Sequence, residues 1–235
     1  MTPKERTNEM TQLEYVRIES IDDPLFKQMH ALMGSIFPPE EVLDFPLWAE
    51  PLKDQGLRVY VAVHGGEVVG ATEYRYYPEM RVAMTDFTII GREGLGVGPF
   101  LARRRAADLA AWAARTEGPL LGMFAEIYRP DEAEALSFGG VKAMNPYVRR
   151  EVLAHLGYRR LDFAYVHPSW QGDGAAVGGL DLCFMPADDS LEHVPGALIG
   201  RFLRTYYGAL NPKPDAWREM VEAVERRESV ALLPL

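Results

Sequence analysis

The feature that most restricts the fold is a run of three strand-like segments separated by very short links. RVYVAVH at 58–64 and EVVGATEYRYY at 67–77 are rich in β-branched and aromatic residues, and Gly65-Gly66 between them is typical of a two-residue hairpin. RVAMTDFTII at 81–90 follows after only three further residues. Because links this short connect antiparallel neighbours, residues 58–90 predict an antiparallel meander rather than a sheet built of repeated βαβ units.

Helical and strand-like segments alternate on both sides of this meander. Asp23 is a plausible helix cap with Pro24 at the first helical position, and Gly157 is a natural helix stop. We expect helices at 23–37, 99–118, 145–158, 195–208 and 215–228, and further strands at 13–20, 119–128, 159–168 and 178–187. This order predicts the α+β class, with a mixed, mostly antiparallel central sheet flanked by helices.

The chain is expected to divide into three parts. Residues 1–12 are polar, contain no apolar secretory segment, and predict a flexible tail. Residues 13–186 would form the main domain. Residues 187–235 would form a helical extension that covers the core or pairs with a second copy in a homodimer.

Composition narrows the class of protein. No apolar run approaches the roughly 20 residues that span a bilayer, and the formal charge of −9 argues against a nucleic-acid partner. Cys183 is the only cysteine, so no intramolecular disulfide can form, and it is expected to be a small buried residue. Together these features predict a cytoplasmic protein with no membrane partner.

Three alternating glycines separate the third strand of the meander from the next helix. Gly94, Gly96 and Gly98 let backbone N–H groups approach a ligand closely, and the helix that follows directs its positive end to the same place. A tight turn alone would need one or two glycines, so the stretch predicts a phosphate site. Neither a Walker A loop nor a G-x-G-x-x-G dinucleotide fingerprint fits, which makes another class of nucleotide-binding α/β enzyme a poor match.

The strand, the G-x-G-x-G stretch and the helix together resemble the acetyl-CoA loop of the GNAT N-acetyltransferase superfamily. VAVHGGEVVG at 61–70, FPPEE at 37–41 and the Leu156-Gly157-Tyr158 element are also similar to that family, so the resemblance covers about residues 13–186. The chain departs from the family at Glu93, where Gln or Arg is usual, with Arg92 one residue earlier. It departs again at Leu153, where many members carry a tyrosine that acts as an acid.

The resemblance implies acetyl-CoA as the acyl donor. Main-chain groups of Thr88, Ile89 and Ile90 would pair with the pantetheine arm as an added strand would. The pyrophosphate would rest on the loop residues Gly94, Leu95, Gly96, Val97 and Gly98, while Pro99 offers no N–H.

Acetyl transfer to an amine also needs a group that removes a proton. Asp86 and Glu126 each interrupt an apolar strand, where a carboxylate is costly unless it is paired or faces a cleft, so either is a candidate base with a pKa raised by burial. Glu73 is a weaker third candidate. Tyr147 or Tyr128 could replace the missing acid, whereas lone histidines such as His155 and His167 are more often structural. No metal-binding spacing occurs, so no metal site is expected.

Two functions remain open at this point. The first is an acetyl-CoA-dependent N-acetyltransferase acting on a small-molecule or peptide amine by direct attack. The second is a catalytically inactive GNAT-like protein that binds acyl-CoA or a partner, which the departures at Glu93 and Leu153 keep open.

Overall fold

The structure is a computed structural model and describes residues 12–37, 42–116, 118–133, 146–169 and 173–235. The chain divides into two compact units. Of the described residues, those up to Leu120 belong to unit 1 and those from Leu121 onward belong to unit 2. The tail expected at 1–12 lies, apart from Gln12, outside the described residues, and so does most of the FPPEE stretch.

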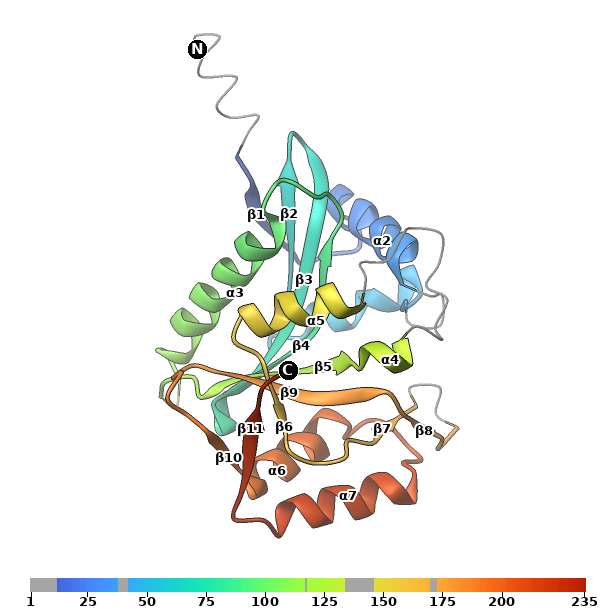
Figure 1. The fold of residues 1–235 in the computed structure, drawn as a ribbon. Coiled ribbons are helices and arrows are strands. Elements are labelled where there is room, and N and C mark those ends of the chain that lie inside the picture. The colour runs from blue at the N-terminus through green and yellow to red at the C-terminus, as the bar shows by residue number, and fades with distance from the viewer. Residues whose placement is uncertain (1–11, 38–41, 117, 134–145, 170–172) are drawn as a thin grey trace. The chain divides into compact units, whose positions relative to one another are not determined.

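Unit 1 contains a four-stranded antiparallel sheet (Figure 1). In spatial order its strands are β1 (Glu14–Ile18), β2 (Leu57–His64), β3 (Glu67–Tyr77) and β4 (Val82–Ile90). The β2–β3 hairpin turns at Gly65 and Gly66, whose φ angles of 59° and 84° suit the primed turns that match strand twist. The predicted meander is therefore confirmed, with a short 3₁₀ turn, η4 (Pro78–Met80), between β3 and β4.

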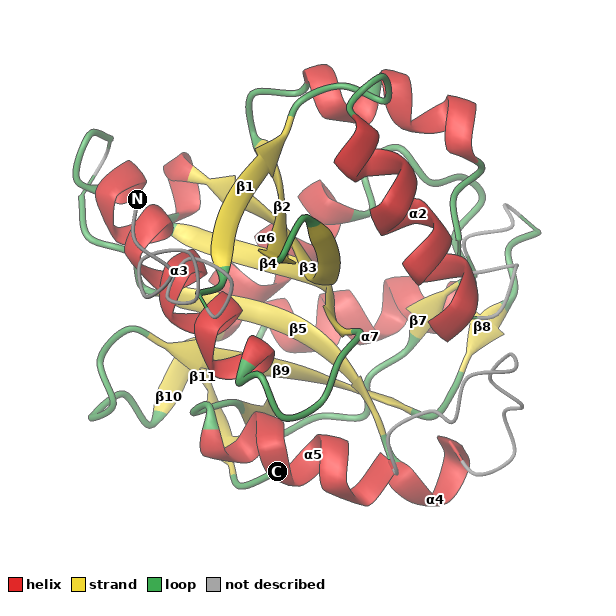
Figure 2. Cartoon of the chain, turned by 90° about the horizontal axis from the view of Figure 1, so that it is seen from above, coloured by secondary structure: helices red, strands yellow, loops and turns green. Residues whose placement is uncertain are grey.

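Two helices cover opposite faces of this sheet (Figure 2). On one face α2 (Pro24–Ile36) packs Phe26 and Met29 against Val61, and on the other α3 (Val97–Ala113) packs Leu101 against Ala62. Val61 and Ala62 contact different helices because successive side chains of a strand point to opposite faces of the sheet. The expected cap of α2 is confirmed, since the Asp23 carboxylate accepts a 2.8 Å hydrogen bond from the Leu25 N–H. The 3₁₀ turns η2 (Phe45–Ala49) and η3 (Pro51–Lys53) precede β2.

Neighbouring strands of unit 2 are also antiparallel to one another. Its strands, in spatial order, are β5 (Gly122–Tyr128), β9 (Leu180–Pro186), β6 (Arg159–Leu161), β11 (Ser229–Leu233) and β10 (His193–Pro195). A separate short ribbon pairs β7 (His167–Pro168) with β8 (Ala176–Val177). Cys183 lies buried on β9, directly opposite Ala125 of β5, as its apolar neighbours predicted.

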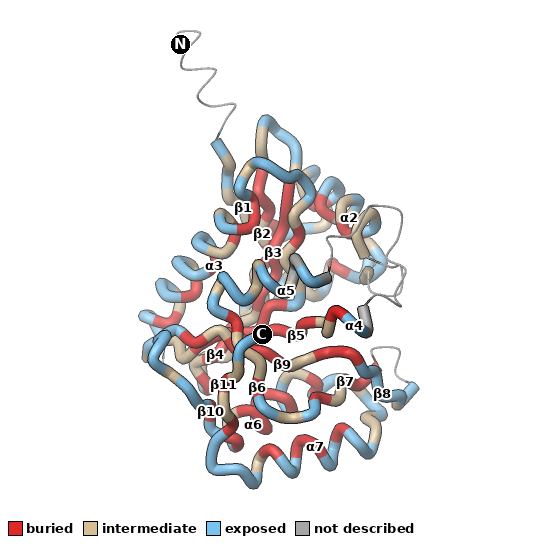
Figure 3. Tube along the Cα trace, in the orientation of Figure 1, coloured by how far each residue is buried: buried red, intermediate tan, exposed pale blue. Residues whose placement is uncertain are grey.

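The helices of unit 2 are α4 (Pro130–Ala133), α5 (Pro146–His155), α6 (Gly196–Tyr206) and α7 (Asp215–Glu225). On one face of the sheet, Arg150 of α5 contacts Asp181 of β9. On the other face, Phe202 of α6 stacks on Phe124 of β5, with 4.0 Å between the ring centroids. Buried and exposed positions alternate along α7 (Figure 3), and its buried side is formed by Trp217, Met220, Val221 and Val224.

The last part of the chain contains more than the expected helices. β11 pairs with β6 through Leu232 and Leu161, and it also pairs with β10, so residues from 187–235 complete the sheet of unit 2. The single strand expected at 159–168 is interrupted, because β6 ends at Leu161 and the next strand, β7, starts at His167. The division at residue 186 stays a prediction, and unit 2 continues across it. Among the described residues, no helix is both long and apolar enough to cross a membrane.

Candidate functional site

The glycine loop of unit 1 connects β4 to α3. Gly94 and Gly96 have φ angles of +79° and +67°, a left-handed conformation that residues with side chains rarely adopt. A Cβ at either position would meet nothing within 4 Å, so glycine is needed there for backbone conformation. Gly98 differs, because a Cβ there would lie 2.9 Å from Cδ1 of Ile90. Gly98 therefore allows the first turn of α3 to pack closely against β4.

The loop and the start of α3 carry backbone donors. The Phe100 N–H donates to the Gly96 carbonyl at 3.1 Å, so the N–H groups of Val97 and Gly98 precede the first hydrogen bond of the helix. The positive end of the helix dipole lies at the same place. Gly94 and Gly96 are exposed and Leu95 is half-buried, so the loop is open to solvent on its outer side. This arrangement suits a phosphate group.

The two charged residues before the glycines do not occupy the loop. The Arg92 guanidinium forms a 2.6 Å ion pair with Glu67 at the start of β3, and Glu93 is exposed. The unusual residue at position 93 therefore leaves the backbone conformation of Gly94 and Gly96 intact.

The strand segment expected to pair with the acyl donor is held firmly in unit 1. Thr88, Ile89 and Ile90 lie opposite Thr72, Ala71 and Gly70 of β3. In an antiparallel ladder alternate residues direct their peptide groups away from the partner strand, which leaves such groups on the far side of β4. Their pairing with a pantetheine arm stays a prediction.

A buried arginine that the sequence did not single out fixes this strand. Arg105 of α3 is 3% exposed, and its Nη1 lies within hydrogen-bond distance of the hydroxyl oxygens of Thr72, Thr88 and Thr85, at 2.9, 2.7 and 3.1 Å. The sequence spacing indicates this burial, because Arg105 lies four residues from both Leu101 and Leu109 and shares their buried face of the helix. Arg105 ties α3 to the end of β4 that precedes the glycine loop.

Asp86 lies next to a second carboxyl group in unit 1. The register between β3 and β4 shifts between Glu73 and Arg75, so that Thr85 and Asp86 together oppose Tyr74, as in a β-bulge. The Asp86 N–H donates to the Glu73 carboxyl at 3.3 Å, and the two side chains also share a hydrogen bond. Asp86 is exposed, whereas Glu73 is buried. The carboxyl group that is buried is thus that of Glu73, the third candidate base. The burial expected for Asp86 is not observed.

The environment of Glu73 favours its neutral form. Burial raises the pKa of Glu73 well above its usual range, and the negative charge of Asp86 raises it further. Two adjacent carboxyl groups therefore share one negative charge, which the better solvated Asp86 carries. This pair can accept a proton at Asp86 while Glu73 acts as a hydrogen-bond donor to it.

Glu126 lies in unit 2 within a compact polar cluster. Its Oε1 accepts hydrogen bonds from the hydroxyls of Tyr165 and Tyr207, which lie 2.8 Å from each other. Its Oε2 lies 3.2 Å from Nε2 of His167. Burial, followed by the charge of Glu126, raises the pKa of both tyrosines, so they remain protonated donors. With three partners on two oxygens, Glu126 is bound as a structural carboxylate would be.

The remaining sequence candidates have simpler surroundings. His167 belongs to the Glu126 cluster, whereas Nδ1 of His155 lies 2.8 Å from the Glu151 carbonyl on exposed α5. Tyr147 is 54% exposed, and Tyr128 ends β5 in a half-buried position. Within the described ranges, no three His, Cys, Asp or Glu side chains are grouped as metal ligands would be.

The chain has the fold of the GNAT acetyltransferases. A structure from Bacteroides thetaiotaomicron, assigned to that family as an acetyltransferase, matches with a TM-score of 0.58 at 13% identity, over 85% of this chain and 99% of that chain. This match confirms the predicted fold class.

Two other similar structures are a GNAT-family protein from Desulfovibrio desulfuricans and the ribosomal-protein-S18-alanine N-acetyltransferase from Escherichia coli. Both have a TM-score of 0.49; their identities are 15% and 10%, and they cover 76% and 77% of this chain and 100% and 99% of their own. No protein-family model and no curated protein matches the sequence.

Proposed function

We propose that this chain is an acyl-CoA-dependent N-acetyltransferase that moves an acetyl group from acetyl-CoA to the amine of a small molecule or peptide. The observation that carries the proposal is the continuity of β4, the glycine loop and α3. One short segment presents the carboxylate of Asp86 and, a few residues later, the backbone donors of Val97 and Gly98. The GNAT fold supports the same assignment.

The loop residues Gly94, Leu95, Gly96, Val97 and Gly98 would hold the pyrophosphate. They fit a phosphate because Gly94 and Gly96 adopt positive φ angles beside open space and α3 directs its first N–H groups there. Thr88, Ile89 and Ile90 would pair through their main chain with the pantetheine arm. When bound, acetyl-CoA supplies a thioester whose acetyl group an amine can attack.

Asp86 would remove the proton from the attacking amine. It is exposed, which gives an acceptor access, and neutral Glu73 next to it donates a hydrogen bond that orients its carboxylate. Glu126 was an equal candidate from the sequence. We assign the role to Asp86 because hydroxyl groups and an imidazole already engage both oxygens of Glu126.

Asp86→Asn tests this assignment. We expect it to lower kcat for release of the CoA thiol with a suitable amine by about 100-fold, since general base catalysis usually contributes at least that much. Binding of CoA, measured by calorimetry, should stay unchanged. Asp44→Asn, an exposed change of the same kind in unit 1, is the matched control and should leave kcat unchanged. Full activity in Asp86→Asn would exclude Asp86 as the base.

The same measurements separate catalysis from binding alone. CoA binding with no thiol release across a broad panel of amines would favour the inactive acyl-CoA-binding protein. Absence of CoA binding in the calorimeter would contradict both functions. Gly96→Leu should weaken CoA binding, because a side chain at a positive φ angle strains the loop.

A further inference from the structure

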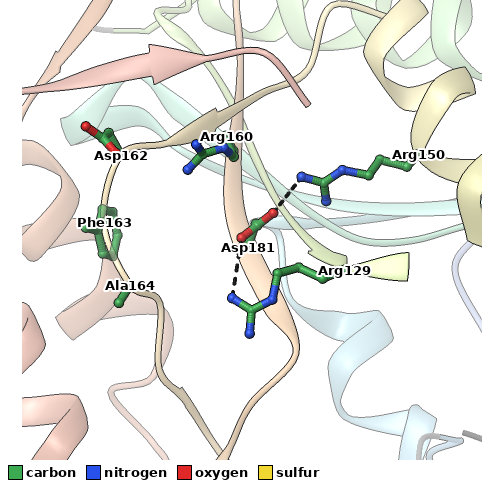
Figure 4. Close-up of a pocket in the computed structure, with 7 residues that line it drawn as sticks. All are labelled: Arg129, Arg150, Arg160, Asp162, Phe163, Ala164 and Asp181. Atoms are coloured by element: carbon green, nitrogen blue, oxygen red, sulfur yellow. Dashed lines mark hydrogen bonds and ion pairs between the residues drawn. The ribbon is translucent and has the colours of Figure 1, made fainter. Parts of the chain in front are cut away.

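Unit 2 contains a hollow of about 390 Å³ that neither the glycine loop nor the carboxyl groups account for. Arg129, Arg150 and Arg160 line it together with Asp162, Phe163 and Asp181 (Figure 4). Three guanidinium groups thus share a small volume with two carboxylates, and one of these, on Asp162, belongs to an exposed residue.

Strand register places this hollow on a definite face of the unit 2 sheet. Asp181 lies opposite Ile127, whereas Glu126 lies opposite Leu182, so Asp181 and Glu126 point to opposite faces. Arg160 lies opposite Cys183, two residues from Asp181, and shares the face of Asp181. The hollow is therefore separate from the Glu126 cluster.

Asp181 neutralises only part of this positive charge. Its carboxylate is 2.7 Å from Nη2 of Arg150 and 3.9 Å from Nη1 of Arg129. Nη1 of Arg150 is buried and has no hydrogen-bond partner among the residues that the structure describes. In the same described ranges, the Arg160 side chain has neither a hydrogen bond nor an ion pair.

A buried donor without a partner is costly, and a guanidinium presents its donors in a planar fork that matches a carboxylate or a phosphate. A small oxyanion between Arg150 and Arg160 would satisfy the free Nη1 of Arg150 and balance the charge of Arg160. Phe163 adds an apolar wall for a short carbon skeleton.

We propose that this hollow is a binding site for a small organic oxyanion, such as a short dicarboxylate or a phosphate monoester. Arg160 and Nη1 of Arg150 bind its oxygens, and Asp181 holds Arg150 in place. The site does not rest on the proposed acetyl transfer, because its residues belong to neither the glycine loop nor the Asp86–Glu73 pair.

The test is calorimetric titration of the full chain with malonate and, in a separate arm, with glycerol phosphate, at low ionic strength. We expect saturable one-site binding of at least one anion, and the tighter arm identifies the carboxylate or the phosphate as the preferred group. Arg160→Gln should weaken that binding about tenfold or more, the loss typical of one charge-assisted hydrogen bond. Arg226→Gln removes the same charge from an exposed position on unit 2 and should leave it unchanged.

Arg160→Gln is the informative variant because the Arg160 side chain has no partner to lose among the described residues. Arg150→Gln would also break the ion pair between Arg150 and Asp181. Unchanged binding in Arg160→Gln would overturn the proposal, since the anion would then bind elsewhere. The absence of saturable binding of both anions would overturn it as well. Phosphate binding that Gly96→Leu removes and Arg160→Gln does not would place the anion at the glycine loop and would likewise overturn it.

Discussion

Glu73 links the stability of unit 1 to pH. Burial and the adjacent Asp86 raise its pKa well above its ordinary value of 4.5, so the folded chain keeps a proton that the unfolded chain releases as the pH rises above 4.5. The stabilising contribution is complete below 4.5 and is lost progressively towards the raised pKa. We expect wild type to lose free energy of unfolding relative to Glu73→Gln as the pH rises from 4.5, measured by urea unfolding.

A second substitution separates the effect of burial on the pKa of Glu73 from the effect of the Asp86 charge. In an Asp86→Asn background the same comparison should show a smaller divergence, because the charge that adds to the effect of burial is gone. Parallel stability curves for wild type and Glu73→Gln at every pH would contradict a raised pKa at Glu73.

The two tyrosines of the Glu126 cluster should depend on each other. Tyr165→Phe and Tyr207→Phe each remove a hydrogen bond to the same carboxylate oxygen, which typically costs about 1.5–3 kcal/mol. Because the two hydroxyls share one acceptor oxygen and lie 2.8 Å apart, the double variant should differ from the sum by about 0.5 kcal/mol or more. Urea unfolding of the four proteins measures this coupling, and strict additivity would argue against a shared network. Tyr60→Phe is the control, because Tyr60 stacks on its neighbours through its ring, which the substitution keeps.

Where β4, the glycine loop and α3 join, Gly98 has a different physical role from Gly94 and Gly96. Gly98→Ala places a Cβ 2.9 Å from Cδ1 of Ile90, and overpacking of this kind typically costs about 1–3 kcal/mol. Ile90→Val deletes Cδ1, so the double variant should regain most of the lost free energy of unfolding. Gly96→Ala is the matched comparison, because its cost comes from a φ angle of +67° and Ile90→Val should not restore it. Equal rescue of both variants would refute this distinction.

The elements that could be predicted from the sequence are those with strong local signals. The Gly65-Gly66 hairpin and the Asp23 cap are each set by residues close together in the chain. The glycine loop was recognised for the same reason. The burial of Glu73 was not, because it depends on the β-bulge that brings Asp86 alongside it from the next strand.

Long-range partners account for the other omissions. In the sequence Glu126 is a single carboxylate within a strand. Its partner Tyr207 lies 81 residues later, so no residue near Glu126 in the chain predicts the contact. β11 was missed because SVALL is short, and only its pairing with β6 and β10 makes it a strand. The hollow beside Asp181 depends on arginines from separate elements of unit 2 in the same way.

In unit 2 the last strand of the chain, β11, connects two other strands of the sheet. β11 lies between β6 and β10 and buries Val230 and Leu232. A chain ending after Glu228 would leave both neighbours without a partner on that side and expose apolar surface. We expect hydrogen exchange to show lost protection in β6 and β10. A chain ending at Leu233 keeps all of β11 and should retain protection; equal protection in both chains would contradict this role.

The burial of Cys183 has a practical consequence for the whole molecule. The sequence contains one cysteine, and in the fold its thiol is enclosed and its pKa is raised, by burial first and then by Asp181. A disulfide reagent such as Ellman's should therefore leave the native protein untouched, so that its colour would report only the coenzyme A thiol that the proposed acetyl transfer releases. In denaturant the same reagent should titrate one thiol per chain, so a single chromophore can follow turnover in one buffer and loss of the native state in another.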